Sequence, residues 1–149
     1  MKVTMMLADA AQAVGGKLYI LGGGWSITGP DPIPSAIAIK IEVPWDQANR
    51  PHRILLSLVN ADGQPVMVPT PEGERPFEIA GQFEVGRPAG LAPGTPLDAI
   101  VAISLGPMPI PPGGRYTWRL SIDGDTDEDW EVAFTTRPTR EGAGPRAIG

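Results

Sequence analysis

The sequence contains no cysteine and a single histidine among its 149 residues. The absence of cysteine excludes disulfide bonds, thiolate metal sites and cysteine nucleophiles. With His52 alone, a histidine-rich metal site is excluded as well, and a serine–histidine–acid triad would depend on this one residue. No G-x-S-x-G nucleophile elbow accompanies it. We therefore interpret His52 as a surface-loop residue.

Basic residues are also few, because 12 lysines and arginines stand against 17 acidic residues, for a formal net charge of -5. An acidic chain is repelled by phosphate backbones, so nucleic acid is not an expected partner. No apolar run approaches the roughly 20 residues that a membrane helix needs, so no membrane span is predicted. The apolar run from Val3 to Ala8 is too short for a signal peptide and is followed by Asp9, which favours a cytoplasmic location.

What the chain has in abundance is glycine and proline, with 19 and 18 residues. They separate strongly patterned apolar segments, so the composition does not indicate disorder. The length favours one domain, which can bury roughly 70% of its unfolded surface without a metal or disulfide. Residues 1–136 are predicted to form this domain. Residues 137–149 show no periodicity and are predicted to be a C-terminal tail, flexible or held by a partner.

Apolar and polar residues alternate with the two-residue period of a β-strand in most segments. The clearest example is 35–43, where Ile37, Ile39 and Ile41 share one face while Lys40 lies on the other. Residues 9–16 are predicted to form one helical turn, capped by an aspartate and ended by a glycine. The pattern predicts about nine strands, over 2–8, 17–28 with a bend at three glycines, 35–43, 53–60, 65–68, 77–85, 97–105, 115–123 and 130–134.

Strands separated by turn residues, with no helix of any length, predict an all-β fold. The even division between apolar and polar faces favours two sheets packed face to face. We therefore predict a two-sheet antiparallel β-sandwich of about nine strands, immunoglobulin-like or related.

Two stretches carry a family resemblance. Residues 7–11, LADAA, followed by 16–25, GKLYILGGGW, resemble the opening of an uncharacterised family of small bacterial β-sandwich proteins, a domain of unknown function. Residues 112–124, PGGRYTWRLSIDG, are similar to the closing hairpin of that family, a pattern that recurs in immunoglobulin-like folds. The resemblance implies a sandwich, and it carries no activity and no functional residues.

The acidic segment 123–129 is the strongest candidate for a metal site. Carboxylates at alternate positions suit Ca²⁺, which prefers oxygen ligands. An EF-hand is excluded, because its sixth and twelfth positions hold Glu128 and Phe134. If successive strands alternate in direction, loops at Asp31 and Asp62 share an end with this segment. The alternative is a solvated hairpin turn, for which Asp and Gly are the expected residues. The candidate ligands are Asp123, Asp125, Asp127 and Asp129; no other cofactor is expected.

The tryptophans offer one candidate ligand platform. Trp118 and Trp130 fall on the apolar phase of their strands, so we expect them in the core. Trp45 follows Pro44 in a predicted loop, and it is the candidate for stacking against a sugar ring.

Two predicted strands, 53–60 and 97–105, are apolar on both faces. A solvated sheet normally presents polar residues on its outer face, so these strands predict an interaction surface, provided that they share one sheet. The alternative is that loop 86–96, turn 106–114 or the tail covers this face within one chain. The candidate interface residues are Leu55, Val59, Ile100 and Ala102.

These features favour a non-enzymatic protein-interaction or assembly module that self-associates or binds a protein partner, because no set of catalytic groups is recognisable. A second hypothesis is a Ca²⁺- or carbohydrate-binding module that uses segment 123–129 or Trp45. A third is a hydrolase or isomerase with a pocket inside the sandwich.

Overall fold

The computed structural model describes residues 1–139 of the chain, and these residues form an all-β fold, as predicted. The only helical element among them is the 3-10 helix η1. No helix within residues 1–139 has the length and apolar character that a membrane crossing requires. The elements in chain order are β1 (Lys2–Ala8), β2 (Ala10–Val14), β3 (Lys17–Leu21), β4 (Ile27–Thr28), β5 (Ser35–Val43), η1 (Trp45–Gln47), β6 (His52–Asn60), β7 (Met67–Thr70), β8 (Gly73–Pro76), β9 (Glu78–Phe83), β10 (Leu97–Leu105), β11 (Arg115–Ile122) and β12 (Asp125–Thr136).

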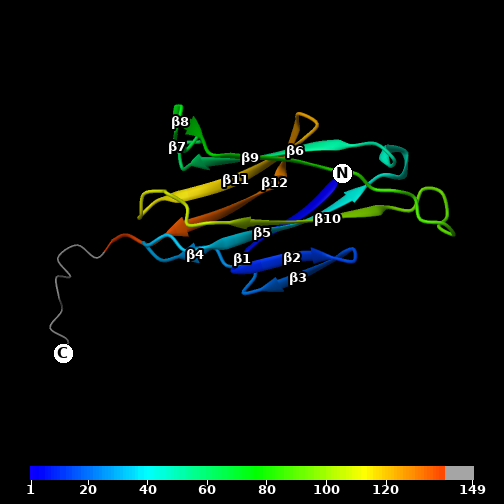
Figure 1. Ribbon diagram of the computed structural model, residues 1–149, viewed down its shortest axis with the longest axis horizontal. Coiled ribbons are helices and arrows are strands. Elements are labelled where there is room, and N and C mark those ends of the chain that lie inside the picture. The colour runs from blue at the N-terminus through cyan, green and yellow to red at the C-terminus, as the bar shows by residue number, and fades with distance from the viewer. Residues whose placement is uncertain (140–149) are drawn as a thin grey trace.

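The strands form four sheets (Figure 1). A three-stranded sheet has the order β1-β5-β10, and a five-stranded sheet has the order β4-β12-β11-β6-β9. The hairpins β2-β3 and β7-β8 form two further sheets of two strands each. Neighbouring strands run antiparallel, except that β4 pairs with the end of β12 in the parallel sense.

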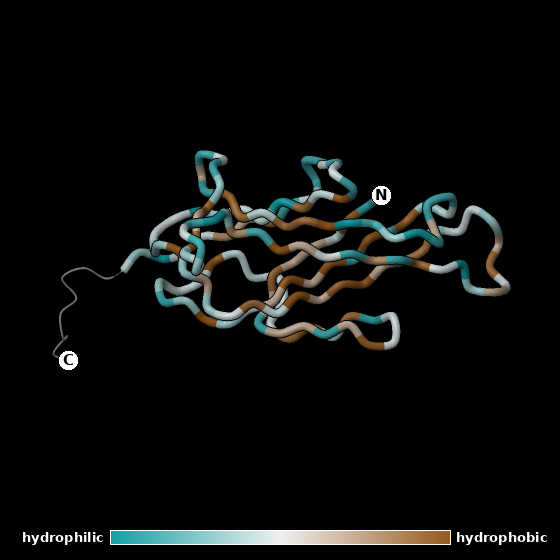
Figure 2. The backbone as a smooth tube through the Cα atoms, turned by 45° about the horizontal axis from the view of Figure 1, so that its top comes forward, coloured by the Kyte–Doolittle hydropathy of each residue, from teal (hydrophilic) through white to brown (hydrophobic). Residues whose placement is uncertain are grey.

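The two larger sheets contribute to one hydrophobic core. Alternation along β5 directs Ile37, Ile39 and Ile41 to the same side, and all three are fully buried. They share a cluster with Leu56 of β6 and Trp118 of β11, which belong to the other sheet. Burying one such side chain contributes roughly 1.5–3 kcal/mol. Figure 2 shows the apolar segments running along the strands.

The helical turn predicted for residues 9–16 is wrong, because β2 occupies this segment and pairs with β3. Gly15 and Gly16, with φ of 59° and 74°, supply the two left-handed residues that a tight hairpin turn needs. The buried Ala11 packs against Ala36 and Ala38 on the outer face of β5. Burial of one face therefore overrides the helical propensity of the alanines.

The number of strands also differs from the prediction. The segment predicted as one bent strand over 17–28 is divided into β3 and the short β4. Residues 69–76, predicted as a loop, form most of the β7–β8 hairpin, in which Pro69 pairs with Glu74. At the start of the predicted tail, Arg137 donates its backbone N–H to the oxygen of Thr28 at 2.9 Å. Residues 140–149 lie outside the described residues.

Candidate functional site

The acidic segment forms a shorter turn than predicted. Asp123 and Gly124, with φ of 53° and 84°, make the turn between β11 and β12. Asp125, Asp127 and Asp129 belong to β12, and the Asp127 carboxylate accepts the backbone N–H of Asp129 at 2.8 Å. Within residues 1–139, no three histidine, cysteine, aspartate or glutamate side chains gather in the manner of a metal site.

The predicted meeting of three acidic loops at one end of the fold is wrong. In the pairing of β6 with β11, Ile54 lies opposite Ile122 and Asn60 lies opposite Tyr116. Asp62 follows Asn60, whereas Asp123 follows Ile122, so the two aspartates lie beyond opposite ends of β6. β4, the strand before Asp31, pairs with Thr135 and Thr136 at the far end of β12, so Asp31 does not share an end with Asp123 either.

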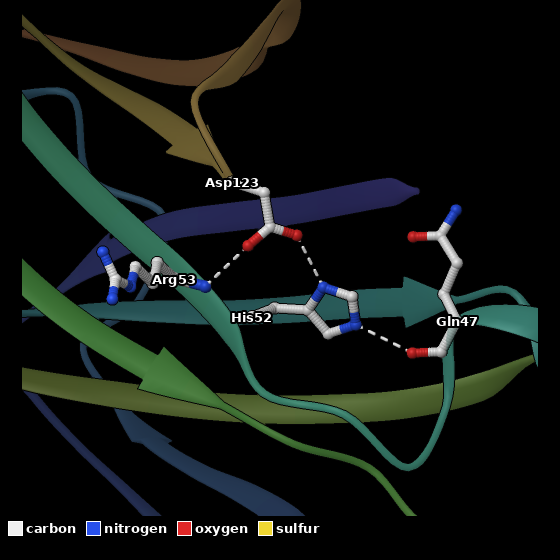
Figure 3. A network of polar contacts seen from close by, with 4 residues as sticks. All are labelled: Gln47, His52, Arg53 and Asp123. Carbon is white, nitrogen blue, oxygen red and sulfur yellow. Dashed lines mark hydrogen bonds and ion pairs between the residues drawn. The ribbon is translucent and has the colours of Figure 1, made fainter.

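His52 is the first residue of β6 rather than a surface-loop residue, and only 2% of it is exposed. Its Nδ1 lies 2.7 Å from an oxygen of the Asp123 carboxylate, and its Nε2 lies 2.8 Å from the backbone oxygen of Gln47 (Figure 3). The ring stacks on Phe83 with centroids 5.2 Å apart. The prediction fails because Asp123, which is 71 positions away in the chain, provides a partner for a polar ring that would otherwise need water.

Both polar partners of the imidazole ring, the Asp123 carboxylate and the Gln47 carbonyl, are acceptors. The hydrogen bond from His52 lowers the pKa of Asp123, and the backbone N–H of Arg53, which donates to the same carboxylate at 2.9 Å, lowers it further. Both ring nitrogens thus have a partner within the chain. The group therefore serves as a clamp that joins η1, β6 and the β11–β12 turn.

Trp45 is part of η1 and is partly buried against the main core. The guanidinium group of Arg87 lies 4.9 Å from the centroid of its ring, a cation–π distance. The same guanidinium donates to the backbone oxygen of Trp45 at 2.6 and 3.0 Å. The side chain that was predicted as an open platform thus already has a cation over its ring. A groove of about 610 Å³ runs beside it, between Met1, Val43 and Pro96.

The predicted interface residues do not form one patch, because β6 and β10 belong to different sheets. Val59 is buried within the chain, where it forms an isolated bridge with Pro65. Ala102 packs in the cluster beneath the β2–β3 hairpin. The covering element is thus this hairpin, and not one of the loops that were expected to cover the face.

The two remaining residues, Leu55 and Ile100, are both partly exposed. Leu55 lies opposite Ala80 and Ser121 on the outer face of the five-stranded sheet. These small neighbours leave a shallow hollow of about 530 Å³ around it. Ile100 lies on β10, which is the last strand of its sheet.

The open edge of β10 is an unpaired strand edge that sequence reasoning missed. The strand pairs with β5 over nine consecutive residues without a register shift. On its other side, no hydrogen bond joins its backbone to another part of residues 1–139. The four central residues, from Ile100 to Ile103, are partly exposed on both faces. The edge position of β10 depends on the order of strands in the sheet, and the alternation of residues within one strand does not predict that order.

A comparison with known families identifies the family of the chain. The sequence model of a family of unknown function, DUF6941, matches residues 3–134, which is most of the chain. The chain belongs to the DUF6941 family. The resemblance to a domain of unknown function is thereby confirmed at that level. A search of curated proteins finds no match.

This DUF6941 chain presents a second apolar surface on the outer face of the β2–β3 hairpin. Leu21 is 71% exposed, and Tyr19 and Val14 are each 56% exposed. The pairing register places Leu21 opposite Ala10 and Tyr19 opposite Gln12 on this face. The inner face of the same hairpin carries Ala11 and Ile20, which pack toward the three-stranded sheet.

Proposed function

We propose that this DUF6941 protein is a non-enzymatic protein-interaction module that self-associates by adding a strand of another chain to the edge of β10. Its scaffold is a two-sheet antiparallel β-sandwich, an interpretation supported by the core that the two larger sheets share. The observation that carries the proposal is the edge of β10, whose outer side has no backbone partner within residues 1–139. Strand addition to such an edge is a common mode of protein recognition.

The energetics favour association at this edge. A strand of nine residues spans about 30 Å and presents a row of backbone donors and acceptors. Each hydrogen bond that replaces two bonds to water contributes about 0.5–1.5 kcal/mol. The partly exposed Ile100, Val101 and Ile103 add apolar surface that a neighbouring strand would cover.

The non-enzymatic character rests on the chemistry of the side chains. The chain has no cysteine, and both ring nitrogens of its one histidine are occupied by acceptors. A general base or a nucleophile activated by histidine needs a ring nitrogen within reach of the substrate. His52 is buried and directed toward Asp123 and Gln47, which supports a structural role for it.

The test is the mass of the protein by light scattering across a concentration series. We expect a mass above that of the 15.7 kDa chain, which falls on dilution. Val101→Lys places a charge at the centre of the open edge. Because this position is partly exposed, the lysine ammonium group can reach water in the monomer. This variant should be a folded monomer, because an inward-facing lysine blocks strand addition.

Leu55→Lys is the matched control, because Leu55 is equally a partly exposed apolar residue but lies on an inner strand of the other sheet. It should associate as the wild type does. A wild type that stays monomeric at every concentration would refute self-association. A wild type whose mass is unaffected by Val101→Lys but lowered by Leu55→Lys would move the contact to the five-stranded sheet.

A further inference from the structure

We infer that the partner strand is β10 of a second copy, paired antiparallel about a two-fold axis at Val101. This inference rests on the proposed function and names its partner and register. The two three-stranded sheets would join edge to edge into one continuous sheet, with β10 of each copy at its centre. A two-fold contact of this kind uses the same surface on both copies and closes without further growth.

The sequence of β10 is complementary to itself in this register. The only charge, Asp98, faces Ser104 of the second copy, so no like charges meet. Ile100 faces Ala102 of the second copy, and Ala99 faces Ile103, so both isoleucines meet a small side chain. Residues directly opposite each other in antiparallel strands share a face, so these pairs keep the inner and outer faces of both sheets in phase.

The choice of axis follows from strand length and exposure. Val101 is the middle residue of the nine in β10, so only an axis there pairs the whole strand with its copy. The partly exposed apolar residues of β10 also lie next to this residue. Leu97, Ala99 and Leu105 are buried by their own chain, whereas the stretch from Ile100 to Ile103 is partly exposed. The partly exposed apolar stretch of β10 therefore includes the proposed axis.

The other edge strands are protected in ways that β10 is not. The side of β12 away from β11 pairs with β4 only at its end. Its unpaired part carries charges that oppose strand addition. β1 begins with Lys2, and its Leu7 oxygen accepts the N–H of Gly24 at 2.7 Å. β9 is shorter, with Glu78 at its start and Gly81 in its interior. The charged residues of β12 are Asp125, Asp127, Glu128, Asp129 and Glu131.

A charge-swap mixture tests the register directly. Val101→Lys and Val101→Glu should each be monomeric, because like charges would face each other across the axis. An equimolar mixture should restore a dimer that contains one copy of each, as measured by native mass spectrometry. The control is the pair Leu55→Lys and Leu55→Glu. Each of these variants should dimerise alone, and their mixture should give homodimers and heterodimers in the statistical ratio. Far-UV circular dichroism checks that each variant is folded.

Because the chain has no cysteine, a single introduced thiol gives a second test. Directly opposite residues in antiparallel strands have Cα atoms about 4.5–5.5 Å apart, which a disulfide can bridge. Val101→Cys, a change of small volume, should cross-link to its copy at least about tenfold faster than Ala61→Cys, because pairing raises the local thiol concentration. Ala61 is exposed in the turn after β6 and reports random collision.

The outcomes separate this inference from the proposed function. A wild-type dimer in which Val101→Cys reacts no faster than Ala61→Cys, and in which the charge variants stay dimeric, would overturn the β10 register while leaving self-association standing. Faster cross-linking at Ala99→Cys or Ile103→Cys than at Val101→Cys would overturn the axis and show a shifted one. A wild-type monomer at all concentrations would overturn both proposals.

Discussion

The Asp123 carboxylate lies 2.7 Å from Nδ1 of His52, although the two residues are 71 positions apart in the chain. The second oxygen of the carboxylate accepts the backbone N–H of Arg53 at 2.9 Å, and the N–H of Asp123 donates to the Arg53 oxygen at 2.8 Å. These contacts attach the β11–β12 turn to the start of β6. Gln47, on the other side of the imidazole ring, extends the attachment to η1.

The first prediction concerns stability in acid. The pKa of Asp123 is lowered from its ordinary value of 3.8, mainly by the hydrogen bond from His52. A carboxyl group with a lowered pKa stabilises the folded state fully above its unfolded pKa, and this contribution is lost as the pH falls through the folded pKa. The melting temperature of the wild type should therefore fall more steeply below about pH 4 than that of Asp123→Asn.

The measurement is thermal unfolding of both proteins between about pH 2 and pH 7. The wild type should be the more stable protein at neutral pH, and the two curves should converge in acid. Asp129→Asn is the control. Asp129 is an exposed aspartate of β12, whereas the aspartate that contacts the His52 ring is Asp123. Parallel curves for the wild type and Asp123→Asn would contradict the stabilising role of the contact.

The second prediction concerns His52 itself. His52→Ala removes a buried ring, its stacking on Phe83 and the donors to Asp123 and Gln47. The free energy of unfolding should fall by about 2–4 kcal/mol, measured by urea titration. His52→Phe keeps the stacking but removes the polar partner of Gln47 and of one Asp123 oxygen, so it should recover only part of the loss. Full recovery of the free energy of unfolding by phenylalanine would show that ring packing alone, and not the polar contacts to Asp123 and Gln47, stabilises this part of the fold.

Local features of the fold were predictable from the sequence, and relations between distant residues were not. Alternation located β5 and β10 to the residue, because burial of one face imposes a period of two. The role of His52 was missed, since its partner Asp123 is brought near only by the pairing of β6 with β11. The shared interface of Leu55 and Ile100 failed for the same reason, because the order of strands in a sheet is a tertiary property.

The third prediction concerns Ca²⁺. One oxygen of Asp123 faces His52, the other accepts from Arg53, and Asp125 and Asp127 lie within β12. Millimolar Ca²⁺ should therefore leave the melting temperature unchanged relative to the same protein in EDTA, since a ligand raises it only by binding the native state. A rise that Asp125→Asn and Asp127→Asn abolish would instead establish a cation site and the second hypothesis for this chain.

The fourth prediction concerns the packing contact between the β2–β3 hairpin and β5. The hairpin approaches the three-stranded sheet closely, because the facing residues Ala11, Ala36 and Ala38 are small, and Ala38 is only 2% exposed. Ala38→Leu adds volume that this contact cannot accommodate, and overpacking of this kind costs about 1–3 kcal/mol. We expect the larger effect to be local, because the hairpin can lift from the sheet while the main core stays packed.

Limited trypsin digestion measures this opening, since Lys17 directly follows the Gly15–Gly16 turn at the tip of the hairpin. Cleavage after Lys17 should be faster in Ala38→Leu than in the wild type, while the global urea midpoint changes less. Lys40→Leu is the matched control, since Lys40 lies on the same outer face of β5 but is partly exposed and pairs with Asp98 at 3.9 Å. It should leave the cleavage rate unchanged. Equal acceleration in both variants would mean that added apolar volume anywhere on this face loosens the hairpin, and that the alanine contact does not hold it.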